Sequence, residues 1–287
     1  MFRQTGYIPQ DEKPDLNRSL LRALSVLKLF SPTSLEMGAT DVSHRASIPV
    51  GTAYRILVTM TQAGFLEKNE ATVKYRIGPE TYMAGNLYLR TNVLLQAAGP
   101  VIRLVNELNE DVCGLSVLEK GFQVLIMREE SRHTFRFAQS TGLGFPAYAI
   151  SAGKALLSAM SEEEIERLYP NEELAALTPN TITTRTRLKE TLAEIRATGI
   201  AFNREESRLG VTSMASVVWN EDGQPVAAIS ISCPTFRLSA WRENAYCGLV
   251  KMAAQVVSHR LGHRSNSVRA ESLDDLREWW RDNGVPG

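Results

Sequence analysis

The sequence predicts a mixed α/β chain, with an N-terminal winged helix-turn-helix followed by a C-terminal α+β sheet domain. Three observations carry this prediction. Three helical patterns and a small hairpin pattern occupy residues 18–78, and strands alternate with helices beyond residue 110. The chain has 287 residues, enough for two domains of about 150 residues each. Apolar residues make up 44% and charged residues 22%, which excludes intrinsic disorder as the main state.

The first segment, residues 1–17, is polar and contains Pro9 and Pro14, so we expect a flexible arm. Apolar residues then recur with the helical period, which predicts a helix over 19–30 with one buried face. The residues of that face are 20, 23, 24, 27 and 30. A second, short helix is expected over 40–46, with Thr40 as its N-cap.

Ser47-Ile48-Pro49 forms a tight corner before a third predicted helix over 50–63. Gly64 follows at the position where helices commonly end. Two short runs on either side of a polar tip, 65–68 and 73–77, predict a hairpin. Three helices with a tight corner before the third, and then a hairpin, predict a winged helix-turn-helix over 18–78. The buried face of the third helix is expected to hold Ala53, Ile56, Leu57 and Met60.

Gly78-Pro79 breaks the chain, and helical patterns follow over 80–90 and 93–109. An apolar stripe marks the second of them, so we expect 79–110 to form a linker and a dimer-contact helix. The alternating pattern beyond it predicts an α+β domain over 111–263. Its expected strands are 112–118, 123–127, 211–219 and 225–232, and its expected helices are 153–160, 162–169, 188–198 and 244–261.

The C-terminal segment 264–287 is a polar spacer followed by a short helical pattern. Leu273, Leu276 and Trp280 share one face of that pattern, and we expect the tail to dock on the body or on a partner chain.

Cysteine and histidine usage argues against disulfides and metals. Cys113, Cys233 and Cys247 are odd in number and far apart, which predicts free thiols in a reducing cytoplasm. The four histidines show no metal-ligand spacing with them, and we expect neither metal nor cofactor. No run approaches the ~20 apolar residues of a membrane span, and the first residues lead into no apolar run. We therefore expect no membrane segment and no signal peptide.

The net charge of zero hides an asymmetry between the two halves. Residues 1–90 carry 11 basic and 8 acidic side chains, net +3, and residues 91–287 carry 21 basic and 24 acidic side chains, net −3. A basic N-terminal module on an acidic body favours a polyanion partner at the N-terminus.

The predicted helix over 50–63 occupies the position that enters the DNA major groove in a helix-turn-helix. Arg55 on its polar face can meet a phosphate or a guanine edge, and Lys68 on the hairpin can meet the flanking backbone. The alternative is a helical bundle whose polar face is merely solvated. The candidate DNA-binding residues are Arg45, Gly51, Thr52, Tyr54, Arg55, Thr59, Lys74 and Arg76.

Spaced blocks in the chain add an independent argument. In order, they are residues 18–27, 53–57, 64–66, 75–78, 145–155, 199–206, 209–211 and 225–232. These blocks resemble the IclR family of bacterial transcriptional regulators over about residues 18–262. Gly51 departs from the pattern, because the family often has a small hydroxyl or polar residue there. The arm and the Trp279-Trp280 tail lie outside the resemblance.

The resemblance implies a ligand-responsive regulator that binds DNA. Because one winged module buries too little surface for tight specific binding, we expect a homodimer or a pair of dimers on a pseudo-palindromic operator. It also implies a GAF-like C-terminal domain that takes a small effector, often an organic acid. The pocket positions it carries over are Ser151, Ala152, Asn203, Ser213, Ser230 and Ser232. Leu143, Phe145 and Met214 can line an apolar wall that suits an aromatic effector.

The residues themselves give a physical account of such a pocket. Ser230 and Ser232 are two apart on a strand, so their hydroxyls share one face. Ser151-Ala152-Gly153 would open a helix whose free N–H groups suit a carboxylate. Without the resemblance, solvent-facing serines are the simpler interpretation.

Two other functions compete with this one. Ser151 and Lys154 match the Ser-x-x-Lys signature of acyl-transfer enzymes, which suggests a Ser-dependent acyl hydrolase with an accessory interaction domain. No Lys-Thr-Gly follows and the companion Ser-Asp-Asn is absent, so we expect no enzyme. A ligand-binding scaffold without a DNA role is the second competitor.

Overall fold

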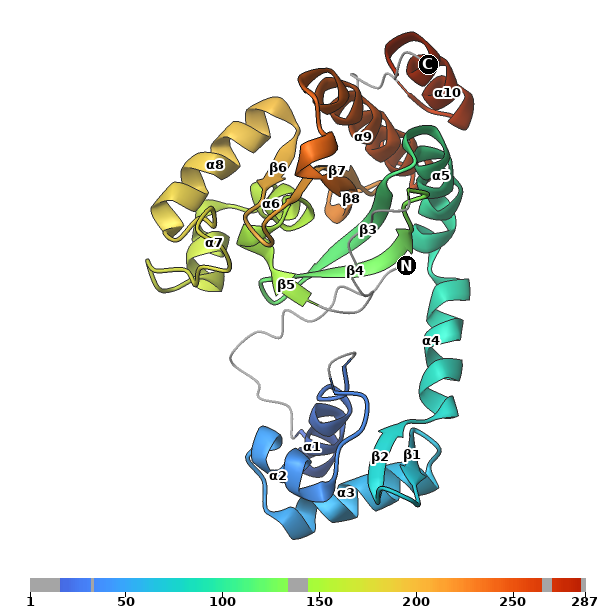
Figure 1. Ribbon diagram of the computed structural model, residues 1–287, viewed down its shortest axis with the longest axis vertical. Helices are drawn as coiled ribbons and strands as arrows, with labels where there is room; N and C mark the ends of the chain where they lie inside the picture. Colours follow the sequence, from blue (N-terminus) through green and yellow to red (C-terminus); the bar gives the residue numbers. More distant parts are fainter. Residues whose placement is uncertain (1–15, 32–33, 134–143, 265–269, 285–287) are drawn as a thin grey trace. The chain divides into compact units, whose positions relative to one another are not determined.

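The computed structural model describes residues 16–31, 34–133, 144–264 and 270–284 and divides into two compact units, Met1–Leu89 and Arg90–Gly287. Each unit has its own hydrophobic core. Figure 1 labels the elements of both. In the described part of the chain, no helix combines the length and the apolar character that a membrane span requires.

The first unit is built from three helices and a two-stranded antiparallel hairpin, as the sequence predicts. A small core holds them together, and it includes Val26, Val42, Leu57 and Tyr75. A further helix starts directly after the hairpin. The elements are α1 (Arg18–Leu27), α2 (Ala39–Ala46), α3 (Val50–Gln62), β1 (Leu66–Asn69), β2 (Lys74–Ile77) and α4 (Pro79–Thr91).

Two local expectations in this unit are wrong. The N-cap of α2 is Gly38 rather than Thr40, because the Asp41 carboxylate accepts a hydrogen bond from the Gly38 N–H at 2.9 Å and closes the first turn. In α1 the buried face is rotated from the expected one. Val26 is fully buried, whereas Leu20 is 57% exposed.

The second unit contains a six-stranded antiparallel sheet with the strand order β5-β4-β3-β8-β7-β6. The four long strands match the predicted ones. The short edge strands β5 and β6 were not among the expected strands, because three or four residues are too few to show a period. The strands are β3 (Val112–Glu119), β4 (Phe122–Glu129), β5 (Gly144–Pro146), β6 (Ala201–Arg204), β7 (Val211–Trp219) and β8 (Pro225–Pro234).

Helices cover both faces of this sheet (Figure 1). On one face lie α5 (Val93–Asn109) and α9 (Ala240–Arg260). On the other lies α6 (Ser151–Ser158), with α7 (Glu162–Leu168) and α8 (Arg185–Thr198) nearby, and two 3-10 turns, η1 (Ala147–Ala149) and η2 (Thr235–Arg237), complete the unit.

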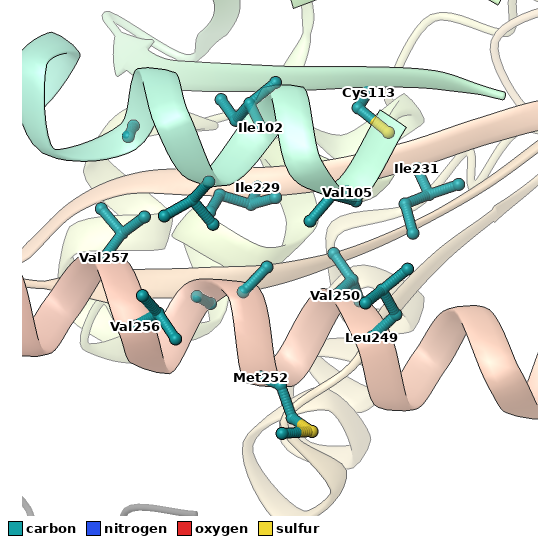
Figure 2. Close-up of a cluster of buried hydrophobic side chains, with 14 of the residues drawn as sticks. Ile102, Val105, Cys113, Ile229, Ile231, Leu249, Val250, Met252, Val256 and Val257 are labelled. Carbon is teal, nitrogen blue, oxygen red and sulfur yellow. The ribbon is translucent and has the colours of Figure 1, made fainter. Parts of the chain in front are cut away.

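The apolar stripe of α5 is buried inside this unit. Figure 2 shows Ile102 and Val105 of α5 close to Ile229 of β8, with Val250 and Val257 of α9 in the same cluster. The apolar stripe itself is therefore covered within the unit, and the dimer contact expected within 79–110 stays a prediction. An amphipathic pattern predicts that one face of a helix is buried, and here residues of the same chain bury it.

The C-terminal helix α10 (Leu273–Asn283) docks on the second unit of the same chain. This is the first of the two docking places expected for the tail, the body or a partner chain. Leu276 is fully buried, and Trp280 stacks on Tyr246 of α9. Gly248 makes room for Trp279, because a Cβ at Gly248 would lie 2.1 Å from the indole ring.

Candidate nucleic-acid interface and effector site

Helix α3 presents a polar face to solvent, as the DNA-binding prediction requires. A left-handed residue, Ser47, turns the chain after α2, and Pro49 caps the start of α3. Ala53 and Leu57 anchor the helix in the core. Of the predicted contact residues on α3, Thr52 is half-buried and the exposed ones are Gly51, Tyr54, Arg55 and Thr59.

The predicted cations differ in how far they are neutralised. Arg76 pairs with Glu67 directly across the hairpin at 2.9 Å, and Lys68 pairs with Glu70 at 2.9 Å. Arg45 donates to the hydroxyl of Ser34 at 2.7 Å. Within the residues that the structure describes, Arg55 and Lys74 form no ion pair. These two side chains therefore keep their full charge for a polyanion.

In the second unit, the structure brings four of the predicted effector residues together at the start of α6. The hydroxyls of Ser151 and Ser213 lie 2.7 Å apart, and Ser213 is directly opposite Ser232 in the sheet. Ser230 follows two residues away on the same face. Ser151 begins α6, so the first N–H groups of this helix have no helical acceptors, as at every helix start.

Two further predicted residues lie beside this cluster with other roles. Asn203 is opposite Ser213, but its amide oxygen accepts from the N–H of Glu206 at 2.8 Å and its amide nitrogen donates to Ser207. It shapes the turn after β6. Ala152 is buried where α6 packs on the sheet.

The predicted apolar wall is only partly in place. Phe145 lies on β5, paired with Gln123 of β4. Met214 is fully buried in the core on the α5 and α9 side, so its place in the effector site is wrong. Adjacent strand residues alternate between faces, and Ser213 already points toward α6. Leu143 lies outside the described residues.

A buried polar pair that was not predicted from the sequence lies on the same sheet face. Gln123 is 1% exposed and donates from Nε2 to the hydroxyl of Ser116 on β3. Its Oε1 atom has no hydrogen-bond partner within the described part of the chain. A glutamine inside the apolar run after Phe122 was the available signal. A buried acceptor without a hydrogen-bond partner favours a ligand or water that donates to it.

Lys154 and Glu206 form a buried ion pair that ties α6 to the turn after β6. Lys154 Nζ lies 2.5 Å from both carboxylate oxygens, and its side chain is 2% exposed. Burial lowers the pKa of Lys154, and the Glu206 carboxylate opposes that effect. Because the amine is engaged by Glu206, the geometry gives no support to a Ser151–Lys154 acyl-transfer pair.

The thiols are equally unsuited to nucleophilic chemistry. All three cysteines are free, and burial raises the pKa of both Cys113 and Cys233 to about 12. Both groups therefore stay protonated at neutral pH.

Comparison with known proteins gives one consistent result. Residues 19–70 match the IclR helix-turn-helix domain, and residues 86–259 match the domain described as bacterial transcriptional regulator IclR C-terminal. The transcriptional repressor IclR of Escherichia coli (strain K12) is 31% identical over 247 residues, which cover 85% of this chain and 90% of that protein.

Solved structures share the fold. An IclR transcriptional regulator from Alicyclobacillus acidocaldarius aligns with a TM-score of 0.79 at 24% identity, covering 86% of this chain and 100% of that one. An IclR homologue from Microbacterium hydrocarbonoxydans, complexed with 4-hydroxybenzoate, aligns with a TM-score of 0.73 at 24% identity, covering 85% of this chain and 98% of that one. The chain therefore belongs to the IclR family of bacterial transcriptional regulators.

Proposed function

We propose that this chain binds a pseudo-palindromic operator as a dimer, and that a small carboxylate effector controls the binding. The observation that carries the DNA-binding part is the exposed polar face of α3, where Arg55 keeps its charge. One winged module buries too little surface for tight specific binding, so two modules are needed. Cytoplasmic location follows from this role.

The dimer contact that we propose lies on α4 and α1 instead of α5. Helix α4 has no buried residue, and it exposes large apolar side chains such as Tyr82, which is 72% exposed. Apolar surface of this extent favours a protein partner, and a second copy supplies a matching face. The exposed apolar residues in question are Leu20 and Leu24 on α1 and Tyr82, Met83, Tyr88 and Leu89 on α4.

For the effector, we propose a carboxylate held by the hydroxyls of Ser151, Ser230 and Ser232 and by the first N–H groups of α6. Phe145 would flank its apolar part, and Gln123 Oε1 would accept a hydrogen bond from a hydroxyl on it. The 4-hydroxybenzoate of the Microbacterium relative has both groups, and we propose the same chemical class here.

The path from effector to DNA runs through β8. Ser230 and Ser232 face the proposed effector, while Ile229 and Ile231 on the other face belong to the core that contains α5. Only Asn92 separates α5 from α4. An effector that binds two states of β8 with unequal affinity would thus shift the helix that leads to the proposed dimer contact.

A ligand screen coupled to DNA binding tests this proposal. Hydroxylated and plain aromatic acids are first screened for thermal stabilisation, and each stabilising acid is then added to protein bound to a selected duplex. We expect at least one acid to change the DNA affinity about fivefold or more. The double variant Ser230→Ala and Ser232→Ala should abolish both effects. Ser216→Ala, whose hydroxyl donates to Gly199, is the matched strand control.

If every acid that stabilises the protein leaves the DNA affinity unchanged, the proposed coupling is wrong. If the double variant responds like wild type, the effector lies elsewhere. Turnover of ester substrates that is lost in Ser151→Ala would instead favour the hydrolase.

A further inference from the structure

A groove of about 360 Å³ separates α1 from α3 in the first unit. Its floor is apolar and includes Ile56 and Met60. Two helices supply its polar wall. Helix α3 contributes Thr52, Arg55 and Thr59, and helix α1 contributes Ser19 and Arg22. Arg22 was not among the residues that the sequence analysis assigned to DNA.

The charge of this groove is one-sided. Arg22 and Arg55 are both exposed, and neither forms an ion pair among the described residues. Among the described residues, no acidic side chain lines the groove. Two like charges that share a groove repel each other, and an anion between them removes the repulsion.

The hydroxyls of the wall fit the same ligand. Thr59 donates to the backbone carbonyl of Arg55 at 2.8 Å, so it is engaged within α3. Ser19 and Thr52 make no side-chain hydrogen bond within the described residues and can donate to an anion oxygen. Guanidinium groups bind phosphate oxygens in a bidentate manner, which lysine cannot do.

We propose that this groove holds one backbone phosphate of the operator, clamped between Arg22 of α1 and Arg55 of α3. The inference rests on the proposed DNA-binding function and adds a second helix to the interface. It makes Arg55 a phosphate contact, and so leaves base reading to the outer residues of α3, such as Tyr54. Phosphate contacts of this kind fix the register of the protein on the duplex.

The apolar side of α1 stays free for the proposed dimer contact. Residues two apart on a helix do not face each other, so Arg22 points away from Leu20 and Leu24. The same helix can therefore contact both DNA and a second copy.

The test uses a labelled short duplex of random sequence, because a phosphate contact does not depend on sequence. Affinity is measured by fluorescence anisotropy over a series of KCl concentrations. Arg22→Ala should weaken binding about fivefold or more. The slope of log K against log salt should also fall, but by less than the ~1 per protomer of an independent contact, because Arg55 still holds the same phosphate. Arg22→Lys should restore the slope but only part of the affinity, because it keeps the charge and loses the bidentate geometry.

Lys28→Ala is the matched control, since Lys28 is an exposed cation at the end of the same helix and does not line the groove. It should change the affinity less than Arg22→Ala and preserve the salt slope. In the double variant of Arg22 and Arg55 to Ala, the losses should be less than additive because both side chains hold one phosphate. Melting temperatures confirm that each variant is folded.

The outcomes separate this inference from the proposed function. Wild type that binds the duplex, with Arg22→Ala and Lys28→Ala equal in affinity and slope, overturns the clamp alone. Fully additive losses at Arg22 and Arg55 would also overturn it, because they would place the two side chains on separate phosphates. Wild type that binds no duplex at all overturns both.

Discussion

Helices α4 and α5 follow each other with one residue between them, yet they differ completely in burial. Of the 13 residues of α4 none is buried, whereas α5 buries nine of its 17. Both carry large apolar side chains. Those of α5 pack on β3 and α9 of the same unit, whereas among the described residues side chains of α4 such as Tyr82 and Leu89 stay exposed.

The difference shows what an apolar pattern in a sequence can and cannot say. It predicts that a face will be covered, but the cover can come from the same chain or from another one. We therefore expect α5 to stabilise the second unit, and we propose α4 as the self-association face.

Truncation of a core residue on α5 should lower the stability of the protein more than any other change below. Ile102 is fully buried between α5, β8 and α9, so Ile102→Ala should lower the free energy of unfolding by about 2–5 kcal/mol. Urea denaturation followed by circular dichroism measures this loss. Sedimentation of the protein that remains folded should show an unchanged dimer, and a change in oligomeric state would mean that α5 also contacts a second copy.

Charges on α4 should weaken self-association and leave the stability of the second unit nearly unchanged. The double variant Tyr82→Glu and Leu89→Glu places like charges on a proposed self-association face, and we expect the dimer to weaken about tenfold or more. The melting temperature of the second unit should hardly change. Ala84→Glu adds the same kind of charge to an exposed small residue of α4 and serves as control. A double variant that stays dimeric would refute the α4 contact.

A smaller change on β8 should affect the coupling between effector and DNA. Ile229 is fully buried on the α5 side of the sheet, so Ile229→Val should cost about 0.5–1.5 kcal/mol of stability. Because the proposed effector contacts the other face of β8, its affinity should be nearly kept while its effect on DNA binding decreases. Titration calorimetry and anisotropy measure the two quantities. Equal losses in both would argue against a path through β8.

Glycine replacements should have the smallest effects. A Cβ at Gly85 of α4 meets nothing within 4 Å, and one at Gly99 of α5 meets Met127 at an ordinary 3.6 Å. Each change to Ala should therefore stabilise its helix by up to about 1 kcal/mol. Thermal melts of the two variants check this. Destabilisation by Gly85→Ala in the dimer alone would show that a partner helix approaches closely at that glycine.

Much of the fold could be predicted from the sequence because long elements have a clear period. The helix over 93–109 and the strands around Asn220 lie where the pattern put them. Short elements such as β5 and β6 could not be found, since three or four residues show no period. The N-cap of α2 depended on a single hydrogen bond from Gly38 to Asp41, which competed with the more usual Thr40.

In the candidate sites, too, some residues could be predicted from a local pattern and others could not. Strand alternation brought Ser213, Ser230 and Ser232 to one face, and the same rule should have excluded Met214. Gln123 and Arg22 could not be found from the sequence because each is a candidate only through a neighbour on another element. Gln123 pairs with Ser116 of β3, and Arg22 shares a groove with Arg55 of α3. Such juxtapositions depend on tertiary packing, which no local pattern contains.

In vitro selection from a randomised duplex library tests most directly whether two α3 helices, paired through α4, recognise DNA together. We expect the enriched sites to contain two inverted half-sites whose centres are separated by a whole number of helical turns, about 10 base pairs each. We also expect two chains to bind each site. Enrichment of an isolated half-site bound by one chain, or no enrichment at all, would show that two α3 helices do not recognise DNA together.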